Sequence, residues 1–267
     1  MKLPLSAAVV DSLVILPEVG STNDELVRRA SAGTLPDFSV VVTGSQTAGR
    51  GRLGRVWVAP PGASLAISVL LRPVLPAGEP LDLSHFGWLP LIAGVAMTRA
   101  VQTVVPAHRV GLKWPNDVQI DSLKVSGLLA ELLPTGDAVV IGAGVNLSLS
   151  REQLPTPVST SLALSGARIS GDELADAVLT SYIENLREIY TDFVRLGGDP
   201  VGSGVSGLVD DLCTTIGAQV KVQLPGADDL LGTAVGIDGT GRLQVRRSQD
   251  GQVVAVAAGD VTHLRYE

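Results

Sequence analysis

The sequence is poor in cysteine and histidine, which build disulfide scaffolds and many metal sites and catalytic triads. Its 267 residues contain one cysteine, Cys213, so no intrachain disulfide can form and a reducing compartment is favoured. The three histidines, His85, His108 and His263, are isolated and lack metal-ligand spacing or a triad partner. Aromatic residues make up 3% of the chain. The core must therefore be built from Val, Leu, Ile and Ala, and Cys213 is expected to be buried.

Excess positive charge and long apolar runs are also missing. The net charge is −7, whereas nucleic-acid binders normally carry a basic face. The stretch 86–105 is apolar but contains Pro90 and Arg99, which indicates a buried helix and not a membrane span. Asp11 interrupts the N-terminal apolar run, so no secretory signal is predicted. No P-loop motif occurs. A cytoplasmic globular protein that binds neither DNA nor membrane is expected.

What is present indicates an α+β fold. The 45% hydrophobic and 18% charged content is globular, and the length suits one large and one small domain. Strands are expected at 9–17, 39–43, 64–71, 111–114, 117–120, 124–133 and 138–147, and helices at 21–32, 83–105 and 172–196. Loops are expected at 44–61 and 150–161. Four short strands in succession favour antiparallel hairpins over repeated strand–helix units.

A second domain is predicted after a glycine-rich linker at 197–204. Five short strands separated by Gly and Asp turns follow it, at 219–224, 231–237, 242–247, 253–257 and 261–265. Such a series predicts a small β-barrel. The expected domains are residues 1–205 and 206–267.

The segment 49–57, Gly-Arg-Gly-Arg-Leu-Gly-Arg-Val-Trp, formally matches the G-x-G-x-x-G dinucleotide fingerprint. That fingerprint requires a helix at the loop and an acid about 20 residues on. Here Pro60 and Pro61 follow, and no acid stands at that distance. A flexible loop is predicted instead, with backbone N–H groups and arginines that suit a carboxylate or phosphate. A solvated basic loop is the alternative.

Three further motifs are candidates for ligand contacts. Lys113-Trp114-Pro115-Asn116-Asp117 offers a cation, an amide and a carboxylate that can help hold Mg²⁺ on a nucleotide, but is also a common turn. In 124–131, Lys124 leads an apolar strand in which Gly127 permits close backbone approach, and Glu131 is expected to be structural. In 142–146, two glycines precede Asn146, which also fits a bulged strand.

Ser21-Thr22-Asn23 can hydrogen-bond a polar head group or simply cap a helix. Thr22 with Glu25 fits a capping box. Both interpretations stay open at this point.

Together and in this order, these motifs resemble the biotin–protein ligase family, over residues 12 to the C-terminus. The resemblance implies a class II aminoacyl-tRNA synthetase/biotin synthetase-like domain, with a central mixed, largely antiparallel sheet and helices, followed by an SH3-like β-barrel. Regulatory members begin with a DNA-binding domain. Here the pattern starts by residue 12, so a monofunctional type without that domain, operator binding or a repressor role is expected.

The resemblance also implies the reaction and the site. Biotin attacks the α-phosphate of Mg-ATP, and a carrier lysine then attacks biotinyl-5′-AMP. The implied catalytic residues are Lys124, Arg50, Arg52 and Lys113. The implied biotin-binding residues are Ser21, Thr22, Asn23, Gln46, Gly49, Arg50, Gly51, Arg52, Trp57, Lys124 and Gly127. The implied ATP-binding residues are Arg50, Arg52, Arg55, Lys113, Asn116, Asp117 and Asn146.

No metal is expected to be held by the protein alone; Mg²⁺ would come with ATP, near Asp117. The implied partner is a biotin carboxyl carrier domain, and the chain is expected to be a monomer or a weak, ligand-dependent homodimer. The loop 147–164 has no aromatic to stack on adenine, so that contact stays unassigned.

Two other functions compete with this interpretation. A lipoate–protein ligase-like acyltransferase would use a similar scaffold, but the polar set at 21–23 and Gln46 suits a ureido ring better than a dithiolane. A non-catalytic module that senses biotin or binds RNA would use the arginine loop. The two lysines and the negative charge argue against it.

Overall fold

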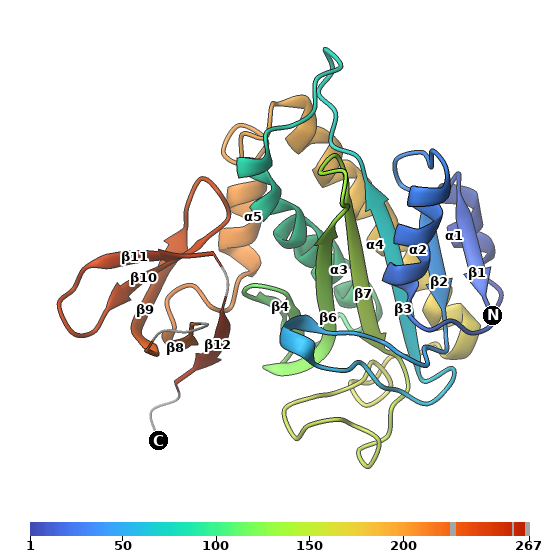
Figure 1. The fold of residues 1–267 in the computed structure, drawn as a ribbon. Helices are drawn as coiled ribbons and strands as arrows, with labels where there is room; N and C mark the ends of the chain where they lie inside the picture. Colours follow the sequence, from blue (N-terminus) through green and yellow to red (C-terminus); the bar gives the residue numbers. More distant parts are fainter. Residues whose placement is uncertain (225–227, 258, 265–267) are drawn as a thin grey trace.

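The computed structural model describes residues 1–224, 228–257 and 259–264, which form two β-sheets with helices against the larger one (Figure 1). The strands of the larger sheet are β1 (Leu13–Leu16), β2 (Val40–Thr43), β3 (Ser64–Leu71), β4 (Val110–Lys113), β5 (Asp117–Ile120), β6 (Leu123–Leu132) and β7 (Val139–Asn146). Their order is β1-β2-β3-β7-β6-β5-β4, and only β1 and β2 pair in parallel. The sheet is therefore mixed and largely antiparallel.

The second sheet in the described residues is antiparallel throughout, with the order β11-β10-β9-β8-β12. Its strands are β8 (Gln219–Gln223), β9 (Leu230–Ile237), β10 (Leu243–Arg247), β11 (Val253–Val256) and β12 (Asp260–His263). The predicted fold class is confirmed. Arg265, the expected end of the last strand, lies outside the described residues.

The helices divide between the faces of the large sheet. They are α1 (Pro4–Val9), α2 (Thr22–Ala32), α3 (Leu89–Val104), α4 (Gly171–Arg195) and α5 (Val205–Leu212), with 3-10 turns η1 (Arg52–Gly54) and η2 (Leu83–Trp88). Helix α3 packs on β4–β6 and against α4, whereas α2 packs on β2, β3 and β7. Figure 1 shows α2 in front of the sheet and α3 and α4 behind it.

The alternation of β7 separates its two faces, because successive side chains of a strand point to opposite sides. Val139, Ile141, Ala143 and Val145 join the main core with α3 and α4. On the other side, Val140 joins a small cluster under α2, formed by Leu26, Val41, Leu70, Leu133, Ala138 and Val140. The remaining residues of that side, Gly142, Gly144 and Asn146, are left for a site.

The strand expected from Val9 is wrong at its start, because residues 4–9 form α1. Pro4 fits the first turn of a helix, where no N–H is needed. The buried carboxylate of Asp176 on α4 accepts hydrogen bonds from the backbone N–H groups of Leu5 (2.9 Å) and Ser6 (2.8 Å). These contacts join residues 170 and 171 positions apart, so they have no local sequence signal.

Two helix starts also differ from expectation. The cap of α2 is Ser21, whose Oγ accepts from the N–H of Asp24, and not Thr22. The helix expected at 83–105 begins as η2, where the Asp82 carboxylate accepts from Ser84 N (2.7 Å), and α3 starts only at Leu89.

The expected linker is followed by a helix that sequence reasoning missed. Val205 and Val209 of α5 are fully buried in the main core, and α5 packs against α3. The division at 205/206 stays a prediction; this packing favours a boundary near residue 213. Buried Cys213 lies there, as expected. The small sheet is fixed to the large domain partly by Trp88, whose Nε1 donates to Gly239 O (2.9 Å).

Candidate active site

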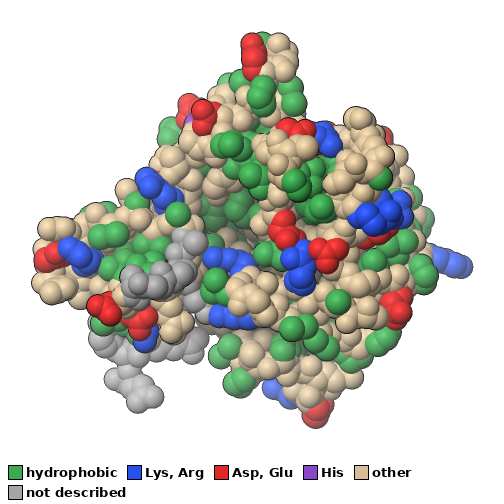
Figure 2. Space-filling view, in the orientation of Figure 1, with side chains coloured by type: hydrophobic (Ala, Val, Ile, Leu, Met, Phe, Trp, Pro, Cys, Tyr) green, Lys and Arg blue, Asp and Glu red, His purple; other side chains and the backbone are tan. Residues whose placement is uncertain are grey.

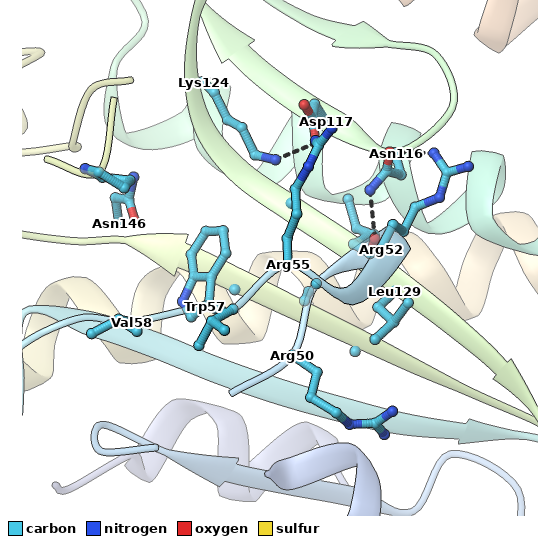
Figure 3. A pocket seen from close by; sticks show the side chains of 18 of the residues that line it. Arg50, Arg52, Arg55, Trp57, Val58, Asn116, Asp117, Lys124, Leu129 and Asn146 are labelled. Atoms are coloured by element: carbon cyan, nitrogen blue, oxygen red, sulfur yellow. Dashed lines mark hydrogen bonds and ion pairs between the residues drawn. The ribbon is translucent and has the colours of Figure 1, made fainter. Parts of the chain in front are cut away.

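A cavity of about 460 Å³ lies between the β3–β7–β6 face of the large sheet, the loop 46–58 and strand β12 of the small sheet. Its volume falls within the ~300–1,000 Å³ of small-molecule sites. Of the predicted site residues, these line it: Ser21, Thr22, Asn23, Gln46, Arg50, Gly51, Arg52, Arg55, Trp57, Lys113, Asn116, Asp117, Lys124, Gly127 and Asn146. Gly49 does not. Figure 3 shows several of these side chains pointing into one space.

Glycines form the floor of the cavity. A Cβ on Gly142 would lie 2.3 Å from Asn23 Oδ1, and one on Gly144 would lie 2.4 Å from the Trp57 indole. Gly127 pairs with Gly144 across β6 and β7, and its Cβ would lie 3.0 Å from Lys124 Nζ. The two glycines of the G-x-G-x-N strand therefore make room for Asn23 and Trp57.

At one end of the cavity, buried polar side chains form a connected set. Ser68 Oγ lies 2.6 Å from Asn23 Oδ1 and 2.8 Å from Thr22 Oγ1. Gln46 Oε1 accepts from Thr22 N (2.9 Å). Ser21, Thr22, Asn23 and Ser68 are all buried. Because hydrogen bonds hold Thr22 to Gln46 and hold Ser68 to Thr22 and Asn23, this end offers preorganised donors and acceptors to a polar ring.

The other end carries cations paired with polar partners. Lys124 Nζ lies 2.6 Å from Asp117 Oδ1, a contact that Figure 3 shows as a dashed line. Arg52 Nη1 donates to Asn116 Oδ1 (3.0 Å). Asn116 Nδ2 in turn donates to Leu128 O (2.7 Å). In the space-filling view, basic side chains with acidic neighbours gather where the two domains meet (Figure 2). This end suits a phosphate or carboxylate.

The glycine–arginine loop folds as a tight hairpin above the floor. Gly51 N donates to Arg55 O (2.7 Å), and Trp57 N donates to Gly49 O (2.9 Å). A Cβ on Gly49 would lie 2.4 Å from Trp57 O, which explains a glycine that does not itself line the cavity. The indole Nε1 of Trp57 is buried without a hydrogen-bond partner in the described residues. A ligand acceptor would satisfy it.

Arg50 projects from this hairpin toward α2 and β6. Its Nη2 donates to Asp24 Oδ1 (2.5 Å) and Glu131 Oε2 (2.8 Å). The hydrogen bond to the Glu131 carboxylate raises the pKa of the Arg50 guanidinium above its usual range.

Comparison with known proteins matches both domains. Residues 16–146 match the model of the biotin/lipoate A/B protein ligase family, and residues 215–264 match the biotin protein ligase C-terminal domain. The chain is 35% identical, over 95% of its length and 89% of the relative, to the biotin–[acetyl-CoA-carboxylase] ligase of Mycobacterium tuberculosis. This chain belongs to the biotin–protein ligase family.

Other members of the biotin–protein ligase family are also similar to this chain. The chain is 32% identical to the bifunctional ligase/repressor BirA of Escherichia coli, over 94% of the chain and 74% of BirA. Among solved structures, the Aquifex aeolicus biotin protein ligase in complex with biotin and ATP superposes with a TM-score of 0.69 at 27% identity. That match covers 96% of this chain and 100% of the other. The Leishmania major ligase with biotinyl-5-AMP gives 0.61 at 29% identity, with 93% and 99% covered.

Several residues in or next to this cavity were not predicted from the sequence. Ser68 sits behind Asn23, Val261 and Thr262 of β12 line the cavity, and Arg52 Nη2 donates to Gly259 O (3.4 Å). The period of two along β6 places Glu131 on the same side as Gly127 and Leu129, so alternation was a usable signal. Nothing local indicated the contribution of β12.

Proposed function

We propose that this chain is an ATP-dependent ligase that adenylates biotin and transfers it to a lysine of a biotin carboxyl carrier domain. One observation carries the proposal: a single cavity joins a buried polar set over a glycine floor to a cationic end. A ureido ring would fit the first, and the carboxylate and α-phosphate would meet at the second.

For this reaction the protein must mainly overcome the repulsion between two anions, the biotin carboxylate and the triphosphate. Cations fixed near the α-phosphate relieve that repulsion and stabilise the charge of the transition state. Lys124 is proposed to lie beside the biotin carboxylate and the α-phosphate, with Lys113 and Arg52 on the phosphates. Asn116 and Asn146 are proposed to lie near the nucleotide.

Magnesium fits this arrangement as a companion of ATP. The described residues contain no group of three or more His, Cys, Asp or Glu side chains that could hold a metal. The described lining residues include one carboxylate, Asp117, which can supply one oxygen ligand when the phosphates supply others. When bound, Mg²⁺ would neutralise phosphate charge.

The hairpin 49–57 is proposed to shield the adenylate from water and stray amines. Arg52 joins this hairpin to Asn116 and to Gly259 O of the small domain. We expect Arg52→Gly to release adenylate, so that lysines of an added bystander protein become biotinylated. Streptavidin blotting of serum albumin incubated with the variant measures this. Bystander labelling no stronger than with the wild type would contradict it.

The remaining proposals concern the setting of the enzyme. None of the described helices has the length and apolar character needed to span a membrane. A cytoplasmic location, a carrier domain as the protein partner and a monomer or weak ligand-dependent homodimer are proposed. The absence of DNA binding stays a prediction.

Pyrophosphate release from Mg-ATP, without carrier protein, tests the activity. Release that requires biotin and is absent with lipoate is the expected result. Release with lipoate alone would move the chain to the lipoate ligases, and no release with either from folded protein would leave a binding module.

A further inference from the structure

Glu131 lies on β6 opposite Val140, on the cavity side of the sheet but outside the cavity lining. Its side chain is 27% exposed. One oxygen, Oε2, accepts a hydrogen bond from Asn23 Nδ2 (2.7 Å) and another from Arg50 Nη2 (2.8 Å). A single carboxylate oxygen thus connects the polar end of the cavity with the glycine–arginine hairpin.

The contact fixes which way the Asn23 amide faces. An ionised carboxylate only accepts hydrogen bonds, so Asn23 must turn its NH₂ group toward Glu131. The same Nδ2 also donates to Leu129 O (3.3 Å), which uses both of its hydrogens. Oδ1 therefore faces Ser68 Oγ (2.6 Å) above Gly142, and its second lone pair is available to a ligand N–H.

That orientation distinguishes ligands. A ureido ring has two N–H donors, whereas a dithiolane ring has none. A site that presents a fixed acceptor gains from the first and leaves the acceptor unpaired with the second, which costs affinity.

We infer that Glu131 is a positioning residue that holds Asn23 as an acceptor for a ureido N–H and ties this orientation to the seated hairpin through Arg50. This role rests on the proposed function, since it acts on biotin through Asn23. A purely structural role would need only a side chain of similar size at this position. The positioning role also requires a carboxylate, which can accept hydrogen bonds but cannot donate them.

The chain offers a matched control. Asp24 accepts from the same Arg50 Nη2 (2.5 Å), but no hydrogen bond joins it to the Asn23 amide, and its side chain is 61% exposed. Asp24→Asn weakens only a hydrogen bond that holds the hairpin through Arg50. Glu131→Gln also weakens such a hydrogen bond, and in addition it lets the Asn23 amide rotate, because a glutamine can donate as well as accept.

The experiment measures KM for biotin and for ATP, with kcat, in pyrophosphate release by the wild type, Glu131→Gln and Asp24→Asn. Glu131→Gln should raise KM for biotin about tenfold, equivalent to about 1.4 kcal/mol, with KM for ATP within about twofold of the wild type. Asp24→Asn should change KM for biotin less than about twofold. Calorimetric titration with biotin should show the same difference in Kd.

A double-mutant cycle with Asn23→Ala sharpens the assignment. Once Asn23 is removed, Glu131→Gln should change KM for biotin less than about twofold. Equal effects of Glu131→Gln and Asp24→Asn, or a full tenfold effect in the Asn23→Ala background, would overturn the positioning role.

Two controls keep the test decisive. If Glu131→Gln fails to fold by circular dichroism, Ser68→Ala removes another partner of the Asn23 amide, the donor to its Oδ1, and should raise KM for biotin more in wild-type than in Asn23→Ala protein. If the wild type binds biotin without releasing pyrophosphate, the proposed activity fails while the titration still tests Glu131. Unchanged biotin Kd in both Glu131→Gln and Ser68→Ala would overturn the inference.

Discussion

The two faces of strands β3 and β7 differ sharply in composition, although the residues of the two faces alternate along the same strands. On the α3 side, each strand presents aliphatic side chains to one continuous core: Leu65, Ile67, Val69 and Leu71 from β3, and Val139, Ile141, Ala143 and Val145 from β7. On the α2 side, the same strands present Ala66, Ser68, Gly142, Gly144 and Asn146 to the cavity region. The α3 face is filled by packed side chains, and the α2 face leaves room for a ligand.

The comparison teaches how one sheet can supply both stability and a site. Filling the core face removes apolar area from water, at roughly 25 cal/mol per Å². The cavity face gives up that gain so that a ligand can lie against the backbone, and it replaces apolar packing with hydrogen bonds among buried polar groups. Changes on the core face should therefore alter stability, and changes on the cavity face should alter activity.

The largest effect is expected on the core face. Ile141→Ala removes a fully buried side chain and should lower the free energy of unfolding by roughly 2–5 kcal/mol. In protein that remains folded, KM for biotin should stay within about twofold of the wild type. Urea denaturation measures the first quantity. A normal unfolding midpoint would show that this face does not carry the stability.

On the cavity side, Lys124→Gln should lower the rate of pyrophosphate release by about 10²–10³-fold, the cost of losing one transition-state contact. Lys221→Gln is the control, because Lys221 forms an ion pair of the same length, 2.6 Å, with Asp229 in the small sheet. Single-turnover kinetics should show full activity for that variant. Equal losses in both would remove the special role of Lys124.

A smaller effect tests the glycine floor. In Gly144→Ala the new methyl group must displace the Trp57 indole, so KM for biotin should rise about tenfold, within the ~1–3 kcal/mol of overpacking. Gly33→Ala provides the control, since an added Cβ there meets nothing within 4 Å. Steady-state kinetics with an unaltered KM in Gly144→Ala would mean that the floor tolerates side chains.

The smallest effect concerns pH and helix α2. Hydrogen bonds from Arg28 and then Arg29 lower the pKa of Glu25 from 4.5 to about 2. Since the folded pKa is depressed, this contribution to stability is present above about pH 4.5 and is lost as the pH falls toward 2. Glu25→Gln should lower Tm at pH 7 by about 2 °C or less, and this difference should shrink between pH 4.5 and 3. A Tm difference independent of pH would contradict the assignment.

Much of this organisation was available in the sequence. Alternating and aliphatic runs predicted the strands from 39 to 147, because period-two patterning reflects which side chains must leave water. The spacing of Lys113–Asp117, Lys124–Gly127 and Gly142–Asn146 indicated a family whose expected site residues, all except Gly49, line one cavity. The rejection of a dinucleotide loop at 49–57 also agrees with the hairpin observed, since no α-helix starts there and residues 52–54 form only the short 3-10 turn η1.

Three of the failures share one cause. Helix α1 is stabilised by Asp176 of α4, α5 is held by burial against α3, and β12 reaches the cavity from the far end of the chain. Each depends on contacts between segments more than 100 residues apart, which leave no local pattern.

The sequence by itself determined the period of each strand, the glycines of the floor and the set of charged residues, because these follow from local sterics and solvation. Only the tertiary structure decided that Glu131 meets Asn23 and Arg50. A carboxylate's partners depend on which side chains the fold brings within 3 Å, and that is set by the packing of α2 and the hairpin over β6.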